Sequence, residues 1–315
     1  PGAARETTVG REPSLSEVPE APGDQARVPS DPVEDHLRRL AVVWGVLSDL
    51  SFADLLLYVR AGTGYLVRSQ VRPTTGQTIY ESDLVGVWAS AAERPLVDRA
   101  WRTGRIERGD LFVEELEDWV AVQATPVTWR GEVVAVMSSE QAPPPRRQPG
   151  ELERVYQAIF GRLARMITAG SFPYPPGPED RVPREPPRVG DGLILLDGDG
   201  RVEFASPNAT SALNRAGAEG QMRSTHLAEA GLDQLATRLA FRTKRPTSEE
   251  VAVGPVVIDL EALPLLVRAE VTGAVVFLRD VSEIRMTPAF LDLHREIWAA
   301  MKEEVLKAYE QQKAI

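Results

Sequence analysis

The sequence predicts an α+β chain with two domains, each an antiparallel sheet with flanking helices, followed by a C-terminal helix. Three observations predict this class. Strand-like runs follow one another closely, and short turns join several of them into hairpins. Amphipathic helical segments flank or interrupt these runs. A proline-rich stretch at 171–188 separates the two sets of elements.

The first ordered element is expected to be a helix that starts near residue 31. Residues 1–30 are small, polar and rich in proline, so we expect them to be disordered. Asp31 can cap the helix, and Pro32 suits its first turn because the missing proline N–H is not needed there. Apolar residues then recur at helical spacing on one face: Leu37, Leu40, Val43, Trp44 and Leu47.

A first domain is predicted over residues 31–170. Helices are predicted at 94–104 and 150–170, and each ends at a glycine, which is common just beyond a helix C-terminus. The short turn at 129–131 joins two strands into a hairpin. Strand-like runs lie at 54–60, 64–73, 119–129 and 132–139.

The clearest domain boundary is the segment 171–188, which carries seven prolines and is expected to be a stiff, polyproline-like spacer. A second domain, 189–285, then reads as a strand, a tight Asp-Gly turn, a strand and a helix. Ser206 can cap that helix, and Pro207 pre-sets its first turn. This order, with further strands after a mixed middle, predicts an antiparallel sheet with helices on one face. The further strands lie at 249–267 and 272–282.

Composition excludes several classes of function. The formal net charge is −10, which argues against nucleic acid as a direct partner because phosphate backbones attract clustered Lys and Arg. The chain has no cysteine, so disulfides, thiol catalysis, cysteine-ligated zinc and flavin–cysteine photochemistry are excluded. A cysteine-free chain fits a reducing compartment, and we expect a cytoplasmic location.

Residues 40–59 resemble a membrane span but are not expected to cross a bilayer. Asp49 and Asp54 lie inside this stretch, and each would cost roughly 2.5–3.5 kcal/mol at the bilayer centre. A helix that runs into a buried strand explains the same residues without that cost. We therefore expect a soluble protein and no membrane partner.

Neither a catalytic site nor a metal site can be assembled from the sequence. Only three histidines are present, and His36 and His226 have no partner at ligand spacing. No glycine-rich phosphate loop precedes a helix, and the acidic run at 197–200 reads as a hairpin turn instead of a calcium loop. We expect no catalytic activity from this chain as it stands and no evident cofactor, while an unknown small-molecule ligand stays open.

Two regions resemble sensor domains of a known family. The runs "ILLDGDGRVEFASPNATSAL" and "GAVVFLRDVSEI" resemble the start and the end of a PAS domain, which opens with a two-strand hairpin and closes on Asp-x-Thr/Ser. The earlier run "LSFADLLLYVRAGTGYLVRSQVRPTTGQT" resembles a GAF-type domain. In this order, over residues 33–285, the pair resembles the sensor half of actinobacterial cytosolic two-component histidine kinases.

That resemblance implies a kinase core after the PAS domain and a response-regulator partner, often one with an RNA-binding output domain. Here the sequence departs from the family, because residues 286–315 contain neither its phospho-acceptor run nor its nucleotide-binding boxes. Three of the four basic residues in this tail are lysines, whereas Lys244 is the only lysine among the 32 basic residues before it. We expect the tail to be a divergent end, a frame change or an appended segment.

The tail is predicted to be an amphipathic helix. Its apolar stripe suits a seam in a homodimer, and packing against the second domain explains it nearly as well. His294 lies on this helix, and we expect it to be a polar helix residue instead of a phospho-acceptor. The apolar residues recur every four positions: Leu293, Ile297, Met301, Val305 and Tyr309.

Two sets of residues are candidate functional sites. At the end of the second domain, the resemblance implies that Arg279, Asp280 and Ser282 couple the last strand to the outgoing helix. A short acceptor side chain there can cap the helix and pass on movement of the strand. In the first domain, a buried core and an exposed sheet edge are alternatives to a ligand pocket. The candidate pocket residues are Tyr58, Tyr80, Trp88, Arg68 and Arg72.

The sequence thus predicts the sensory region of a cytosolic two-component histidine kinase. It would detect a ligand or a partner and pass the signal through the last PAS strand to an output helix. The alternative is a free-standing GAF/PAS regulatory module that acts by protein–protein interaction without kinase activity. A kinase reading frame that continues after the PAS domain would separate the two hypotheses.

Overall fold

The computed structural model describes residues 31–113, 116–143, 148–175, 187–217, 222–230, 235–253 and 256–282. Several predictions from the sequence concern residues outside these ranges: the disordered segment 1–30, most of the spacer, the C-terminal helix and His294.

The first unit is the part of the chain from α1 to α4, and it contains a six-stranded antiparallel sheet. The strands lie in the order β3-β2-β1-β6-β5-β4, so β1 and β6 are central. Its helices are α1 (Pro32–Val42), α2 (Trp44–Ser51), α3 (Pro95–Thr103) and α4 (Glu151–Thr168). Its strands are β1 (Asp54–Ala61), β2 (Gly64–Val71), β3 (Trp88–Ala89), β4 (Glu107–Val113), β5 (Asp118–Trp129) and β6 (Glu132–Gln141).

The second unit runs from residue 187 to residue 282 and contains a five-stranded antiparallel sheet in the order β8-β7-β11-β10-β9. The last strand, β11, therefore lies at the centre of the sheet, between the first strand and β10. Its helices are α5 (Pro207–Arg215), the 3₁₀ helix η3 (Leu227–Ala230) and α6 (Leu235–Thr243). Its strands are β7 (Leu193–Leu196), β8 (Val202–Ala205), β9 (Thr247–Val253), β10 (Val256–Val267) and β11 (Glu270–Asp280).

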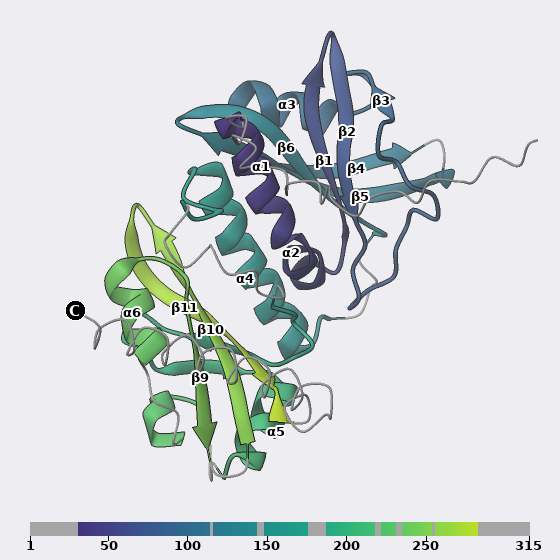
Figure 1. Cartoon of the computed structure of the whole chain (residues 1–315). Helices are drawn as coiled ribbons and strands as arrows, with labels where there is room; N and C mark the ends of the chain where they lie inside the picture. The colour runs from purple at the N-terminus through teal and green to yellow at the C-terminus, as the bar shows by residue number, and fades with distance from the viewer. Residues whose placement is uncertain are drawn as a thin grey trace, which may run out of the picture.

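These elements stack in five layers (Figure 1). Helix α3 covers one face of the first sheet, and α1, α2 and α4 cover the other. Helix α4 also packs against β10 of the second sheet, whose far face is covered by α5 and α6. The α+β class predicted from the sequence is confirmed.

Helix α1 begins as the sequence predicts. Asp31 Oδ1 accepts a hydrogen bond from the Val33 N–H at 2.9 Å, and Pro32 occupies the first position of the helix. The predicted apolar stripe is divided between two helices, because the helix is interrupted at Val43, where φ is −98° and ψ is 10°.

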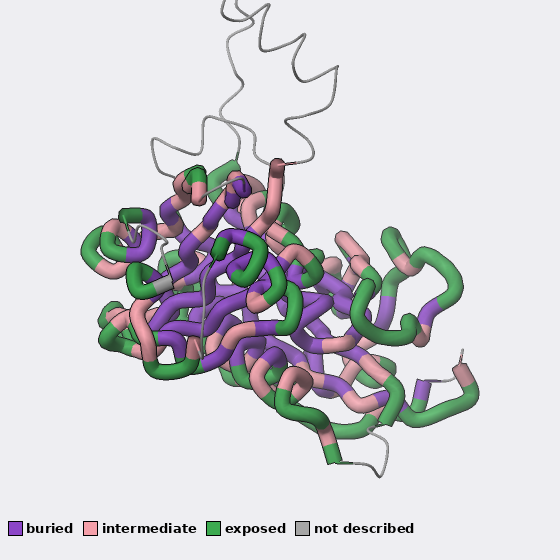
Figure 2. The backbone as a smooth tube through the Cα atoms, turned by 90° about the horizontal axis from the view of Figure 1, so that it is seen from below, coloured by how far each residue is buried: buried purple, intermediate pink, exposed green. Residues whose placement is uncertain are grey.

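Strand β1 is buried on both faces, which explains why its sequence is a continuous apolar run instead of an alternating one. Leu55 and Leu57 face the helices between the sheets. Leu56 and Tyr58 face α3 and belong to a separate cluster on the other side of the sheet. Figure 2 shows buried residues gathered in the middle of the molecule and exposed residues around its periphery.

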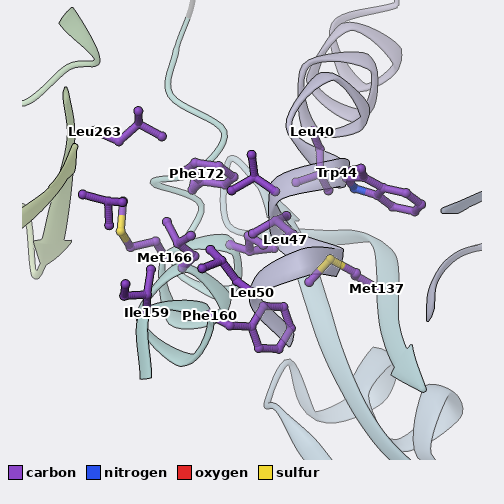
Figure 3. Close-up of a cluster of buried hydrophobic side chains, with 14 of the residues drawn as sticks. Leu40, Trp44, Leu47, Leu50, Met137, Ile159, Phe160, Met166, Phe172 and Leu263 are labelled. Carbon is purple, nitrogen blue, oxygen red and sulfur yellow. The ribbon is translucent and has the colours of Figure 1, made fainter. Parts of the chain in front are cut away.

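The two units share one continuous apolar core, which lies around α4 (Figure 3). Leu47 and Leu50 of α2 pack with Ile159 and Met166 of α4, and Leu263 of β10 closes the cluster from the second sheet. Because each of these side chains is at least 95% buried, separating the units would expose them to water.

Hydrogen bonds add specificity to this contact. Arg162 of α4 donates to the carbonyl and the hydroxyl of Thr272, at 2.9 and 2.7 Å. The Leu266 N–H donates to the sulfur of Met166 at 3.2 Å, and the Tyr174 hydroxyl donates to the Pro264 carbonyl. Each bond joins the end of the first unit, or the residues just after it, to β10 or β11.

Two features differ from the sequence-based expectations. The edge strands β3 and β4 were not predicted, because β3 has only two residues and β4 begins with charged, largely exposed residues that hide the short apolar face of Leu111 and Val113. The start of the predicted spacer is part of the core instead of a solvated connection, since Phe172 and Tyr174 are buried and pack edge to face. No helix in the described part of the chain is both long enough and apolar enough to span a bilayer.

Leu263→Ala should destabilise both units together. The change removes a buried side chain from the shared core, and we expect the free energy of unfolding to fall by about 2–5 kcal/mol. Chemical denaturation followed by tryptophan fluorescence checks this, because every tryptophan among the described residues lies in the first unit.

The matched control is Leu260→Ala, on the opposite face of the same strand, where the side chain packs with α5 and α6. It leaves a similar cavity that does not touch the shared core, so the tryptophan transition should shift less. A Leu263→Ala variant whose tryptophan transition does not move would contradict a shared core.

Candidate functional site

The loop between β2 and β3 forms a strap, residues 72–87, that is held against the first sheet by buried carboxylates. Asp49 Oδ1 accepts hydrogen bonds from the N–H and the hydroxyl of Thr74, at 2.6 and 2.8 Å. Asp54, at the start of β1, accepts from the Thr78 hydroxyl at 2.8 Å and from the Ile79 N–H at 2.7 Å. The strap is thus fixed by specific polar contacts instead of by its own secondary structure.

A third buried carboxylate, Glu140 of β6, organises a charged cluster under the strap. The Tyr80 hydroxyl of the strap donates to Glu140 Oε2, and the Ser138 hydroxyl donates to Oε1 at 2.6 Å. Arg94 Nη1, at the start of α3, lies 3.2 Å from Glu140 Oε2. The Arg94 guanidinium also lies over the Tyr58 ring, 5.9 Å from its centroid.

Burial makes the protonation states of this cluster interdependent. Asp54 and Glu140 face each other across the β1–β6 pair, and both are fully buried. Burial raises the pKa of Asp54, and the hydrogen bonds from Ile79 and Thr78 oppose this only in part. Burial and the Glu140 carboxylate raise the pKa of Tyr80, so its phenol stays protonated and remains a donor.

Arg94 supplies the only positive charge that the described contacts bring to Glu140. Burial is the largest single influence on Arg94 and lowers its pKa, but the Glu140 carboxylate, Tyr58 and Tyr80 together outweigh burial and hold the pKa of the guanidinium above its usual value. A buried pair of this kind is sensitive to the loss of either member, because the remaining charge would lack a partner.

The structure brings together three of the five predicted pocket residues. Tyr58 and Tyr80 belong to the cluster, and Arg72 fixes the strap by donating to the carbonyls of Tyr80 and Ser82, at 3.1 and 2.8 Å. Arg68 and Trp88 lie outside this cluster.

Arg68 lies on the opposite face of the sheet, where it pairs with Glu34 of α1. Side chains alternate along a strand, so Tyr65 and Val67 of β2 face α3 whereas Arg68 does not. Trp88 is 49% exposed and donates from Nε1 to the Ala61 carbonyl at 3.2 Å. Neither residue joins the cluster around Glu140.

The sequence reasoning missed the charged members of the cluster. Glu140 follows the apolar run of β6, Asp54 precedes that of β1, and Arg94 stands directly before the helix α3. A charged residue that adjoins a buried strand was the available signal, because such a residue needs a partner in the fold.

The residues at the end of β11 are bonded to three parts of the second unit: the segment just before β7, helix α5 and strand β10. Arg279 forms a salt bridge with Asp191 at 2.9 Å, and Asp280 forms one with Arg215 of α5 at 3.0 Å. Ser282 lies beyond the strand, and its hydroxyl accepts a hydrogen bond from the Val257 N–H of β10 at 2.9 Å.

Asp280 also accepts a hydrogen bond from the Ser282 N–H at 3.1 Å. Partial burial would raise the pKa of Asp280, but the bonds from Ser282 and Arg215 outweigh it and hold that pKa below its usual range. The carboxylate therefore stays ionised and fixes the first residues after the strand.

Ser206 is the N-cap of α5, as the sequence suggests. Its hydroxyl accepts from the Ala209 N–H at 3.3 Å and from the Leu193 N–H of β7 at 2.9 Å. The same side chain therefore joins the first strand of the second unit to its first helix.

The two histidines that the structure describes, His36 and His226, are not gathered into a ligand site. His36 is buried against Trp129, with ring centroids 4.8 Å apart, and neither ring nitrogen has a hydrogen-bond partner among the described residues. His226 lies in the second unit. Within the described ranges, no three His, Asp or Glu side chains are grouped so that they could hold a metal ion.

Comparison with known proteins agrees with this architecture. Residues 29–159 match the family model described as "Histidine kinase PdtaS, GAF domain". A solved structure described as the sensor region of a sensor histidine kinase superposes with a TM-score of 0.69 at 32% identity, over 82% of this chain and 96% of that one. The chain belongs to the family of histidine kinase sensor regions.

Curated relatives extend the likeness over both units of this sensor region. The sensor histidine kinase PdtaS of Mycobacterium tuberculosis is 34% identical over 268 residues, and that of Mycolicibacterium smegmatis is 35% identical over 272 residues. Each alignment covers 80% of this chain and 53% of the relative, so the chain spans about half the length of the curated relatives it matches.

Glu140→Gln should destabilise the first unit strongly. The change leaves the Arg94 charge buried without a carboxylate, and we expect a loss of about 3–5 kcal/mol in the free energy of unfolding. Chemical denaturation measures this loss, with Glu81→Gln on the exposed side of the strap as the matched control. A loss no greater than that of the control would contradict a buried ion pair.

Mild acid should destabilise the first unit through His36. Burial, with a smaller contribution from Arg39, lowers the pKa of this histidine to about 4. Between the unfolded value near 6.5 and this folded value, only the unfolded chain takes up a proton. The free energy of unfolding is therefore unaffected by His36 above pH 6.5. It decreases as the pH is lowered below 6.5, by about 3 kcal/mol at pH 4.

The variant His36→Leu isolates this effect. It keeps an apolar side chain against Trp129 and cannot bind a proton, so its stability should change less between pH 6.5 and 5 than that of the wild type. His226→Gln is the control and should keep the wild-type slope. Equal slopes for His36→Leu and the wild type would contradict the assignment.

Proposed function

We propose that this chain is the sensory region of a cytoplasmic two-component histidine kinase, with a GAF domain as its first unit and a PAS domain as its second. The first assignment rests on the family match over residues 29–159. The second is supported by the hairpin of β7 and β8 that opens the unit and by the central strand that closes it at Asp280 and Ser282.

The proposed signal begins in the first unit, at the strap. The strap lies over a cluster of buried charges, and the contacts of Tyr80 and Arg72 connect it to that cluster. A ligand or a partner that favours a different arrangement of the strap would shift the population between two states. Helix α4 would carry this shift, because it contacts β5 on one side and β10 on the other.

The output is proposed to be the end of β11, and this is the observation that carries the proposal. Three polar side chains fix the residues that leave the strand, and each has a partner on a different element: Asp191, α5 or β10. A small movement of the central strand would change these contacts together and would reorient whatever follows Ser282.

The partners follow from the same proposal. A histidine kinase acts on a response regulator, and we propose one as the partner of the full-length protein, with an RNA-binding output as one form it could take. We also propose a homodimer, in which the output segments of two chains lie side by side. The alternative is a free-standing regulatory module that acts through protein contacts without kinase activity.

Ser282→Ala tests the output in the full-length protein that contains this region. The variant loses the acceptor for the Val257 N–H, at a cost of about 1 kcal/mol in stability. Because the lost bond lies at the proposed output, the rate of histidine autophosphorylation should change several-fold, measured with labelled ATP. Thr243→Ala, which removes the exposed hydroxyl bond to Leu239 on α6, is the control and should leave that rate unchanged.

A kinase rate that Ser282→Ala does not alter would contradict the output role of β11. A full-length protein that incorporates no phosphate, alone or with a response regulator, would favour the free-standing module instead.

A further inference from the structure

A groove on the second unit has features of a ligand site. Its lining residues are separate from Arg279, Asp280 and Ser282 at the end of β11. The groove lies between α6 and the tight turn that joins β7 to β8, and its volume is about 430 Å³. This volume lies in the range of small-molecule sites in proteins. Helix α6 packs on the face of the second sheet opposite α4, so the groove is remote from the shared core.

Two arginines and one carboxylate line the described part of the groove, although the whole chain carries a formal net charge of −10. Arg238 and Arg242 line it from α6, and they are one helical turn apart, which places both on the same side of that helix. His226 lines it from the position just before η3, and Asp199 is the single carboxylate in the lining that the structure describes. Arg242 forms no ion pair with any described residue.

A buried hydroxyl supplies a second, independent observation. Thr237 lines the groove and is 4% exposed, yet its Oγ1 has no hydrogen-bond partner within the described part of the chain. A threonine in a helix commonly donates to the carbonyl one turn earlier, and an unpaired buried hydroxyl costs stability. An acceptor atom placed in the groove would satisfy it.

The remaining wall is apolar and aromatic, because Phe241 lies beside the two arginines on the same helix. We propose that this groove binds a small organic anion, a carboxylate or a phosphate ester, between α6 and the β7–β8 turn. The guanidinium groups of Arg238 and Arg242 would hold its charged oxygens, the Thr237 hydroxyl would donate to one of them, and Phe241 would contact its carbon skeleton.

Binding of this kind does not depend on the signalling role proposed for β11. Anion binding is measured by calorimetry on the sensor region itself, whereas the signalling role of β11 is measured as the autophosphorylation rate of the full-length kinase. The two proposals can therefore fail separately.

Isothermal titration calorimetry with two probes tests the inference, with ionic strength kept constant by sodium chloride. Inorganic phosphate tests the phosphate chemistry, and succinate tests the carboxylate chemistry. We expect saturable binding of at least one probe, and the one that binds identifies the anionic group preferred. Arg242→Gln should weaken that binding by tenfold or more.

Three further variants separate a specific site from general charge effects. Thr237→Val has the same shape but no hydroxyl, so it should fold at least as stably as the wild type while binding several-fold more weakly. Asp199→Asn removes the carboxylate from the lining and should tighten binding a few-fold. Arg268→Gln, at an exposed position of the same unit, should bind like the wild type.

Absence of saturable binding by both probes would overturn the inference. Equal weakening by Arg242→Gln and Arg268→Gln would also overturn it, because the anion would then respond only to net charge.

Discussion

The arrangement of the whole chain depends on one helix, α4, whose two sides are buried against two different sheets. Its apolar side chains close the core of the first unit, and Met166 and Ile159 also belong to the cluster that Leu263 enters from β10. Apolar burial of this extent is the largest favourable contribution to folding, so the two sheets are held at a fixed spacing. The residues just after α4 extend the contact, because Phe172 and Tyr174 are buried in it.

The polar features lie on either side of this core. The cluster around Glu140, with Tyr80 of the strap, is in the first unit, on the far side of β1 and β6 from α4. The bonded residues Arg279, Asp280 and Ser282 end the central strand of the second unit. A packed core has few intermediate arrangements, so a rearrangement at one of these sites can reach the other through α4 as a discrete step.

The sequence predicts the parts of this structure that depend on local periodicity and on turn chemistry. The cap at Asp31, the hairpin at 129–131 and the succession of strands and helices along the second unit follow from the residues themselves. In the hairpin, Arg130 and Gly131 both have positive φ, 50° and 88°, as a two-residue hairpin turn requires. The apolar sequence of β1 also predicts that both of its faces are buried, because it does not alternate polar and apolar residues as a strand with one solvent-exposed face does.

What could not be predicted depends on contacts between distant residues. Glu140 and Tyr80 are 60 positions apart, and only the fold shows that the Glu140 carboxylate accepts a hydrogen bond from the Tyr80 hydroxyl. The edge strand β4 carries Arg108 and Asp110 on exposed positions, and its pairing with β5 supplies the reason that it is a strand. Likewise, the prolines after Gly170 indicate a spacer, whereas tertiary packing draws Phe172 into the core.

A double-mutant cycle between Leu47 and Leu263 measures the coupling of the two units through the shared core. These side chains come from α2 and β10 and line the same small apolar cavity, although 216 positions separate them in the sequence. The free energy of unfolding would be measured for the wild type, Leu47→Ala, Leu263→Ala and the double variant. A shared core predicts a coupling energy of about 0.5–3 kcal/mol. Strictly additive losses would mean that the two sheets are stabilised independently, and would contradict the account.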